Sequence, residues 1–202
     1  TYPDFDDHPR HVYTAKHAAA GKTVEVDLYE ASNVRAACTR DKAPRRVRIG
    51  IDVGSTSTKT MVVTAEGTVV AGFYTRTSGA PLRAVQAVFE AIDDCAARLG
   101  MELEIQGVAT TGSDRSFVGA IVGADLVLDE ISAHARAAIE IDPETDTIIE
   151  IGGQDAKFTT LSNRVVTFSH MNTVCAAGTG SFLEEQAARL DVGLDDYAEL
   201  AE

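Results

Sequence analysis

Residues 49–60 read IGIDVGSTSTKT and carry the residue types of an anion-binding loop. An apolar run holds one acid, Asp52, and is followed by a glycine, several hydroxyls and a lysine. Backbone amides in a tight glycine turn can form a concave anion site, to which hydroxyls and a lysine add donors and positive charge. We therefore expect this loop to bind phosphate. The candidate phosphate contacts are Gly54, Ser55, Thr56, Thr58 and Lys59.

Asp52 is an acid within an apolar strand pattern, where its charge is strongly disfavoured unless it faces a cation or hydrogen-bond donors. Magnesium held through water is the economical partner for such a carboxylate. The common phosphate loop, G-x-x-x-x-G-K-[ST], precedes a helix, whereas the loop at Gly54 precedes a second strand pattern. A phosphate site here must therefore rely on turn amides and not on the N-terminus of a helix.

A second stretch, IEIGGQDAKF at residues 149–158, repeats the pattern of residues 51–60. The alignment places Glu150 on Asp52, Gly152 on Gly54 and Lys157 on Lys59, each 98 residues further on. Both copies lie at the same point of a strand–turn–strand pattern, so we infer an internal duplication, with a chance match as the alternative. Two facing loops of this kind would hold a polyphosphate from both sides. The other interpretation is two ordinary glycine hairpins whose acids cap or solvate locally.

Strand patterns flank both loops and alternate with helical patterns. Strands are expected at residues 23–31, 46–54, 59–67, 67–77, 105–112, 125–130, 146–163 and 164–172, and helices at 81–100, 115–123, 131–141 and beyond residue 180. The short turns, including Glu66-Gly67, make residues 46–77 three consecutive antiparallel strands. Pro81 begins the first helix and Gly100 ends it.

The order of these elements predicts an α/β protein with three segments. Residues 1–45 form an N-terminal extension or linker with one strand, residues 46–142 a first half with the first loop, and residues 143–202 the start of a second half. Because the chain begins with Thr and ends within a helical pattern, we expect it to be a piece of a longer protein.

Composition excludes several classes of protein. The 202 residues carry a formal charge of −13, whereas a nucleic-acid-binding protein needs a net basic face, and the basic stretch 35–48 is more simply a solvated linker. No segment approaches the ~20 apolar residues of a membrane span, and no signal-peptide pattern is present. We therefore expect a soluble, cytoplasmic protein that binds neither nucleic acid nor membranes.

The three cysteines are Cys38, Cys95 and Cys175, an odd number without a C-x-x-C pair, so neither a disulfide framework nor a self-contained zinc site is indicated. Cys95 is expected to be a small core residue of its helix. Cys175 precedes a glycine-rich turn and a helix, where donors stabilise a thiolate or an anionic cluster. The residues alone favour a small buried side chain in a tight turn at Cys175.

Five motifs in order support a family resemblance: GIDVGSTSTK, ATTGSDR, DEISAHARAA, IIEIGGQDAKF and NTVCAAGTGSFLEEQAARL. Residues 46–202 resemble the ATPase activators of 2-hydroxyacyl-CoA dehydratases and the related ATPase subunits of benzoyl-CoA reductases. The resemblance implies an actin-like ATPase fold with two ribonuclease-H-like halves and mixed sheets, the second half incomplete here. It also implies binding of ATP or ADP with Mg²⁺.

The resemblance implies site roles as well. Asp52 and Glu150 would face the metal, while Gln154 and Asp155 of the second loop would bind magnesium and orient the attacking water. Asp52 and Asp155 are thus the expected magnesium ligands, and Gly152 and Gly153 would bind the nucleotide. His134 falls where the family has a similar Glu-x-x-x-His helix, but a structural or interface role stays open.

By the same resemblance, Cys175 would be one ligand of a [4Fe–4S] cluster shared across a homodimer, with a second cysteine of each subunit beyond residue 202. ATP hydrolysis would then drive transfer of a low-potential electron to a partner dehydratase or reductase. The rival hypothesis is a non-redox protein on the same fold, either a small-molecule kinase or a regulatory nucleotide-binding module. A kinase would need a substrate-facing acid that the sequence does not reveal.

Overall fold

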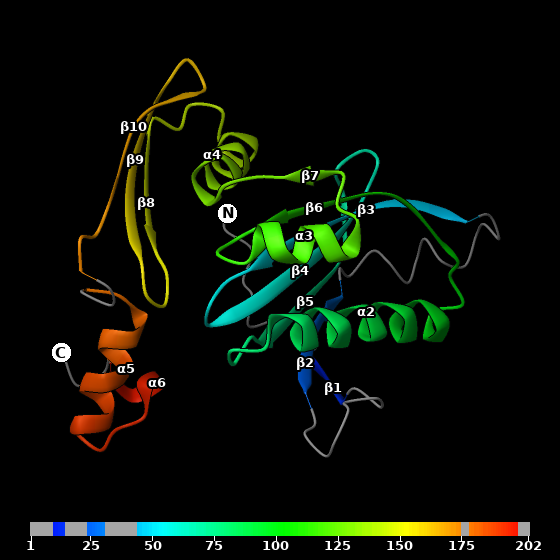
Figure 1. The fold of residues 1–202 in the computed structure, drawn as a ribbon, viewed down its shortest axis with the longest axis horizontal. Coiled ribbons are helices and arrows are strands. Elements are labelled where there is room, and N and C mark those ends of the chain that lie inside the picture. Colours follow the sequence, from blue (N-terminus) through cyan, green and yellow to red (C-terminus); the bar gives the residue numbers. More distant parts are fainter. Residues whose placement is uncertain (1–9, 15–23, 31–43, 175–177, 198–202) are drawn as a thin grey trace. The chain divides into compact units, whose positions relative to one another are not determined.

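The computed structural model of the chain describes residues 10–14, 24–30, 44–174 and 178–197. These residues belong to two units, Thr1–Glu130 and Ile131–Glu202, and each unit has its own sheet (Figure 1). No helix in these described ranges combines the length and the apolar character that crossing a membrane requires.

The first unit is built on a seven-stranded sheet with the order β1-β2-β5-β4-β3-β6-β7. Its strands are β1 (Arg10–Thr14), β2 (Glu25–Glu30), β3 (Arg45–Val53), β4 (Ser57–Thr64), β5 (Val69–Arg76), β6 (Leu103–Thr111) and β7 (Leu126–Val127). The antiparallel order β3, β4, β5 is confirmed. β6 pairs parallel with β3, and β7 pairs parallel with β6, so the sheet is mixed.

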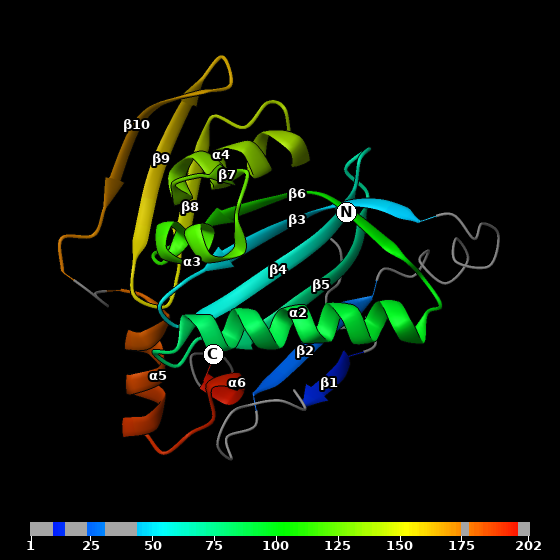
Figure 2. The ribbon, with the colours of Figure 1, turned by 45° about the vertical axis from the view of Figure 1, so that its right-hand side comes forward.

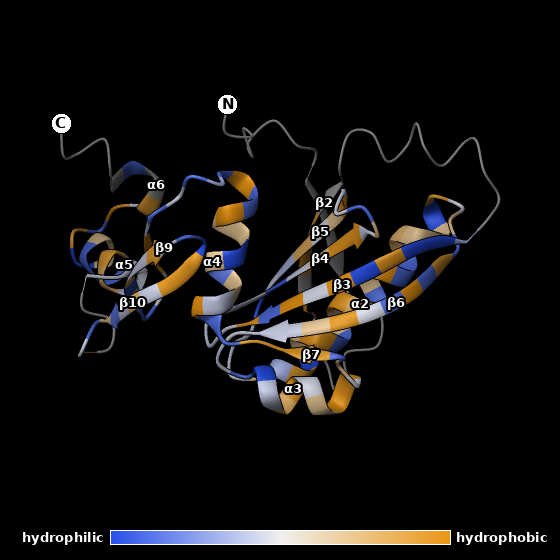
Figure 3. Ribbon diagram, turned by 90° about the horizontal axis from the view of Figure 1, so that it is seen from above, coloured by the Kyte–Doolittle hydropathy of each residue, from blue (hydrophilic) through white to orange (hydrophobic). Residues whose placement is uncertain are grey.

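β3 shows why this sequence forms a strand with two different faces. Its apolar residues recur at every second position, and Val47, Ile49, Ile51 and Val53 are all buried. Because side chains alternate across a strand, Asp52 faces the opposite side of the sheet. The alternation of hydrophobic and hydrophilic segments along β3 is visible in Figure 3.

The described residues of the first unit include the helices α2 (Pro81–Arg98) and α3 (Arg115–Val122). α2 lies over one face of the sheet (Figure 2), and its residues Val85 and Ile92 share one apolar cluster with the buried residues of β3. Cys95 is 4% exposed in the same cluster, which confirms that it is a core residue. The acid of β3 therefore lies on the face away from α2.

The predicted turn at Glu66-Gly67 joins β4 to β5. Gly67 has a φ of +86°, a conformation that glycine adopts without strain, and its amide donates to the Thr64 carbonyl at 3.0 Å. A hydrogen bond to the Thr64 side chain lowers the pKa of the Glu66 carboxyl, with further lowering from its own backbone hydrogen bond. The turn thus confirms the short connection between the strands.

The N-terminal segment contributes two strands to this sheet, and the prediction of a single strand there was wrong. β2 matches the expected alternating stretch and pairs antiparallel with β5. Val26 and Leu28 of β2 are both fully buried in the main apolar cluster. β1 escaped prediction because its five residues, RHVYT, form an edge strand without a clear apolar alternation.

The second unit holds a three-stranded antiparallel sheet with the order β10-β9-β8. Its elements are α4 (Glu130–Ile141), β8 (Thr147–Ile151), β9 (Ala156–Ser162), β10 (Val165–Met171), α5 (Gly180–Arg189) and α6 (Leu194–Tyr197). Ala135 and Ile139 of α4 pack on Leu161 of β9 in a small apolar cluster. α4 therefore covers one face of this sheet and is grouped with the second unit, ahead of the boundary at residue 142 indicated by the sequence.

Leu28→Ala tests whether the N-terminal strand is part of the core. Leu28 is fully buried opposite Phe73 of β5, so we expect a loss of about 2–4 kcal/mol in the free energy of unfolding from lost burial and a residual cavity. Val69→Ala on β5 is the control, because Val69 is 40% exposed. The free energy of unfolding of both variants is measured by urea unfolding. Equal losses in the two variants would contradict the packing of β2 in the core.

Candidate functional site

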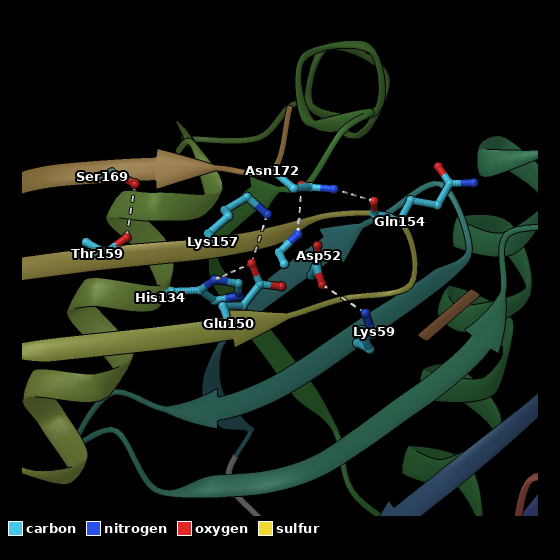
Figure 4. Close-up of polar contacts among 10 residues, drawn as sticks. Asp52, Lys59, His134, Glu150, Gln154, Lys157, Thr159, Ser169 and Asn172 are labelled. Carbon is cyan, nitrogen blue, oxygen red and sulfur yellow. Dashed lines mark hydrogen bonds and ion pairs between the residues drawn. The ribbon is translucent and has the colours of Figure 1, made fainter. Parts of the chain in front are cut away.

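The first loop is the β3–β4 hairpin, which places an acid and a lysine directly opposite each other. Asp52 and Lys59 are cross-strand partners, and Lys59 Nζ lies 3.3 Å from Asp52 Oδ2 (Figure 4). The lysine side chain is 48% exposed and the carboxylate 33%. The pair therefore lies at the surface of the first unit, where either partner can meet a ligand.

Gly54 closes this hairpin with a bond inside the turn. Its amide donates to the Ser57 carbonyl at 3.0 Å, and a Cβ at position 54 would lie 3.0 Å from that same oxygen. A side chain would force the turn to shift, which explains the glycine. The Gly54 amide is engaged inside the turn in this structure, and its contact with phosphate stays a prediction. The exposed residues Ser55 and Thr56 form the tip of the turn.

Thr77, the residue after β5, holds the same turn from behind. Its hydroxyl donates to the Gly54 carbonyl at 2.7 Å, and its amide donates to the Thr56 carbonyl at 2.9 Å. Thr58 is fully buried, and its hydroxyl lies 3.0 Å from that of Thr77, so it faces the interior and not the loop surface. No motif pointed to Thr77, because its role depends on the pairing of β5 with β4.

The motif ATTGSDR lies against Asp52, because β6 runs parallel to β3. Gly112 has a φ of +92°, and a Cβ there would be 2.5 Å from the Val53 carbonyl oxygen and 2.6 Å from Asp52 Oδ1. Asp114 donates its amide to the Val53 carbonyl at 3.0 Å. Only glycine allows this approach, so residues 109–115 help to fix the acid of the first loop.

Thr111 adds a hydroxyl at this point of the sheet. It pairs in register with Asp52, and among the described atoms its buried Oγ1 has no hydrogen-bond partner. A buried hydroxyl without a partner costs about 1–3 kcal/mol, so it is an unusual feature beside a carboxylate. The motif ATTGSDR was recognised from the sequence, but no role was predicted for Thr111.

The second loop, between β8 and β9, repeats the geometry of the first. Glu150 and Lys157 are cross-strand partners with Lys157 Nζ 2.9 Å from Glu150 Oε2, and Gly152 donates its amide to the Asp155 carbonyl at 2.8 Å. Both contacts match those of the first loop after the shift of 98 residues. The repeat seen in the sequence thus extends to the hydrogen bonds of the two hairpins.

The second loop is fastened to the start of α5. Gly180 and Ser181 donate their amides to the Gly152 and Gly153 carbonyls at 3.0 and 2.9 Å. The fully buried Thr179 donates its hydroxyl to the Gly153 carbonyl at 2.9 Å. The first amides of α5 therefore donate to carbonyls of the loop. These hydrogen bonds connect the loop rigidly to α5 within the second unit.

Asn172 supports the other side of the second loop. Its Oδ1 accepts from the Ala156 amide at 3.0 Å, and its Nδ2 donates to the Gln154 carbonyl at 3.4 Å (Figure 4). The same Nδ2 also donates to the Val174 carbonyl at 2.6 Å. The side chain of Gln154 is exposed and Asp155 is half-buried, which leaves both at the tip of the turn. Sequence reasoning missed Asn172, since an isolated Asn carries no motif.

His134 of α4 lies beside the acid of the second loop. Its Nδ1 is 3.9 Å from Glu150 Oε2, the oxygen that also accepts from Lys157. The structure therefore brings His134 to the loop, a placement that the sequence left open.

No group of three His, Cys, Asp or Glu side chains that could hold a metal ion occurs within the described ranges. The carboxylates of Asp52 and Asp155 still fit Mg²⁺, which binds through one or two carboxylates and takes its other ligands from phosphate and water. Cys175 and Cys38 lie outside the described residues. An iron–sulfur cluster needs four ligands, and the described segments contain one cysteine, the core residue Cys95.

Each loop combines a glycine turn, an acid at the end of one strand and a lysine opposite it. Turn amides and a lysine favour a polyanion, and an acid nearby can hold the hydrated cation that accompanies it. Binding and hydrolysis of a nucleoside triphosphate need this positioning and neutralisation of charge more than covalent chemistry.

Comparison with known proteins agrees with this chemistry. Residues 49–202 match the BadF/BadG/BcrA/BcrD ATPase family. The (R)-2-hydroxyglutaryl-CoA dehydratase activating ATPase of Acidaminococcus fermentans is 39% identical over 158 residues, which make up 75% of this chain and 56% of that protein. The chain spans about half the length of the curated relatives it matches.

Two solved structures share its fold. Component A of the A. fermentans (R)-2-hydroxyglutaryl-CoA dehydratase has a TM-score of 0.63 at 35% identity, over 76% of this chain and 57% of that one. The activator of the 2-hydroxyisocaproyl-CoA dehydratase from Clostridium difficile, solved with bound ADPNP, has a TM-score of 0.61 at 33% identity, over 74% and 54%. The predicted actin-like ATPase fold is confirmed.

Gly112→Ala tests the close approach of ATTGSDR to Asp52. Gly123→Ala is the matched control, because Gly123 has a φ of +65° but open space around its α-carbon. The control should cost about 1–2 kcal/mol of unfolding free energy from backbone strain alone. Gly112→Ala should cost clearly more, because its Cβ also overlaps the Val53 carbonyl. Equal losses in urea unfolding would show that the approach is not tight.

Proposed function

Because the chain belongs to the BadF/BadG/BcrA/BcrD ATPase family, we propose that it binds and hydrolyses ATP with its two loops and acts within an activator of an acyl-CoA dehydratase or reductase. The observation that carries this proposal is the repeated acid–lysine pair, Asp52 with Lys59 and Glu150 with Lys157. A structural hairpin needs no such pair at its end, and its presence in both loops favours a role in nucleotide binding for each.

In the first loop we assign phosphate binding to Lys59 and to the amides of Ser55 and Thr56. The Lys59–Asp52 pair is exposed, and such pairs contribute only about 0–1 kcal/mol, so a polyphosphate can displace the carboxylate. Lys59 then contacts the β- and γ-phosphates, and the released Asp52 faces the hydrated magnesium ion.

In the second loop Gly153, Gln154 and Asp155 form the tip that meets the phosphates. Gly152 keeps its amide inside the turn, so its contribution is to the shape of the loop. Asp155 and Glu150 supply oxygen atoms for the magnesium ion and its water shell, and the exposed amide of Gln154 orients the attacking water. These groups hold and align the reactants, which is the main requirement of phosphoryl transfer.

The bonds between the second loop and α5 provide a route from the nucleotide to the rest of the protein. Cys175 lies shortly before Gly180, where α5 begins. A shift of the loop carbonyls after hydrolysis acts directly on the first amides of α5 through their hydrogen bonds. The helix start therefore couples the phosphate site to the segment that contains Cys175.

We further propose that Cys175 supplies one thiolate to a [4Fe–4S] cluster shared by two copies of the protein in the cytoplasm. Such a cluster would supply a low-potential electron for a partner dehydratase or reductase. Support comes from the family and from relatives described as activators of 2-hydroxyglutaryl-CoA and lactoyl-CoA dehydratases.

Lys59→Met in the complete protein tests the assignment of the first loop. We expect ATP turnover to fall by about 100-fold or more, because the γ-phosphate loses its charged donor, while visible absorption from any bound cluster stays intact. Arg46→Met is the matched control, since Arg46 forms a pair of the same length, 3.3 Å, with Glu104 at the other end of β3, where both side chains are more exposed. Unchanged turnover in Lys59→Met would refute the role.

Thr179→Val tests the connection to α5. In the wild type, addition of an ATP analogue should slow hydrogen–deuterium exchange in residues 178–190. Removal of the hydroxyl bond to Gly153 should reduce this response, whereas Thr179→Ser keeps the bond and should preserve it. An identical response in the valine variant would show that the hydroxyl does not transmit the change.

A further inference from the structure

The two equivalent lysines differ in burial and in the tightness of their ion pairs. The side chain of Lys59 is 48% exposed and lies 3.3 Å from its acid, whereas that of Lys157 is 8% exposed and lies 2.9 Å from Glu150. An exposed lysine can move to a ligand at little cost. If a buried lysine moves away from its carboxylate, both charges are left without a partner, which costs free energy. Lys157 is therefore held in place.

The covering helix explains this difference. Residues Lys157, Thr159 and Leu161 alternate on one face of β9, and Leu161 packs under α4. The acid–lysine pair of the second loop thus lies on the face that α4 covers. In the first unit the described helix α2 covers the face opposite to Asp52 and Lys59, which leaves that pair open.

The two oxygens of Glu150 have different surroundings. Oε2 accepts from Lys157 at 2.9 Å and has His134 Nδ1 at 3.9 Å, as Figure 4 shows. Oε1 instead lies over the loop, since a Cβ at Gly152 would be 3.2 Å from it. The carboxylate is therefore anchored through one oxygen and presents the other to the second loop.

On the basis of the nucleotide site proposed above, we propose that Lys157 is a positioning residue that orients Glu150 and does not bind phosphate. Lys157 holds Oε2, with His134 beside it, so that Oε1 points to the loop, where it would meet the magnesium ion and its water. The duplicated lysines have thus divided their work: Lys59 binds the ligand, and Lys157 fixes the acid. The alignment of the two loops, by itself, would assign both to phosphate.

The test compares Lys157→Met with Lys59→Met in the complete protein. Lys157→Met should lower kcat by about tenfold or more with the Kd for ATP changed by less than about twofold, whereas Lys59→Met should weaken ATP binding by about tenfold. Calorimetric titration gives the Kd, and steady-state hydrolysis gives kcat. If Lys157→Met weakened ATP binding as much as Lys59→Met, the proposal would be overturned.

A double-mutant cycle separates positioning from general destabilisation. Glu150→Gln removes the group through which Lys157 acts, so adding Lys157→Met to it should lower kcat by less than about twofold more. The double variant also removes both charges, which keeps the comparison usable if Lys157→Met alone fails to fold. If the fold-losses in kcat of the two single variants instead multiplied in the double variant, the proposal would be contradicted. A wild-type protein without ATP hydrolysis would instead contradict the proposed function and not the orientation of Glu150.

Discussion

An acid and a lysine facing each other across a two-stranded hairpin are the contact on which both candidate loops depend. The register of β3 with β4, and of β8 with β9, brings Asp52 to Lys59 and Glu150 to Lys157. The pairing gives the carboxylate at the end of each apolar strand a neighbour of opposite charge. It also places a lysine ammonium group next to the turn amides. Each hairpin therefore carries both a positive and a negative side chain near its turn.

Each turn is held by residues from a later part of the chain. The Thr77 hydroxyl donates to the Gly54 carbonyl of the first loop, and the Thr179 hydroxyl donates to the Gly153 carbonyl of the second. A loop whose carbonyls are engaged keeps its shape before a ligand arrives, which reduces the ordering cost of binding. In the second unit the same bonds include the first amides of α5, so that rigidity and communication share one set of contacts.

The duplicated loops have kept their turn geometry and changed their surroundings. An open pair exchanges partners easily, and a covered pair resists exchange, because charge separation is costlier away from water. We infer that the cover of α4 over one copy separates the proposed roles of the two lysines, ligand binding for Lys59 and orientation of Glu150 for Lys157. The first acid has a different neighbour, since Gly112, the residue after β6, lets the backbone approach Asp52 Oδ1 closely.

The sequence by itself determined the strand and turn of each loop, the antiparallel order of β3 to β5, the duplication and the family. These follow from short-range signals: alternation, glycine turns and motifs in a fixed order. Tertiary structure alone decided that β6 lies parallel to β3, that Thr77 and Asn172 hold the loops, that β1 exists, and that Lys157 is buried. Such features depend on which distant segments pack together, because burial and hydrogen-bond partners belong to the assembled surface and not to the local pattern.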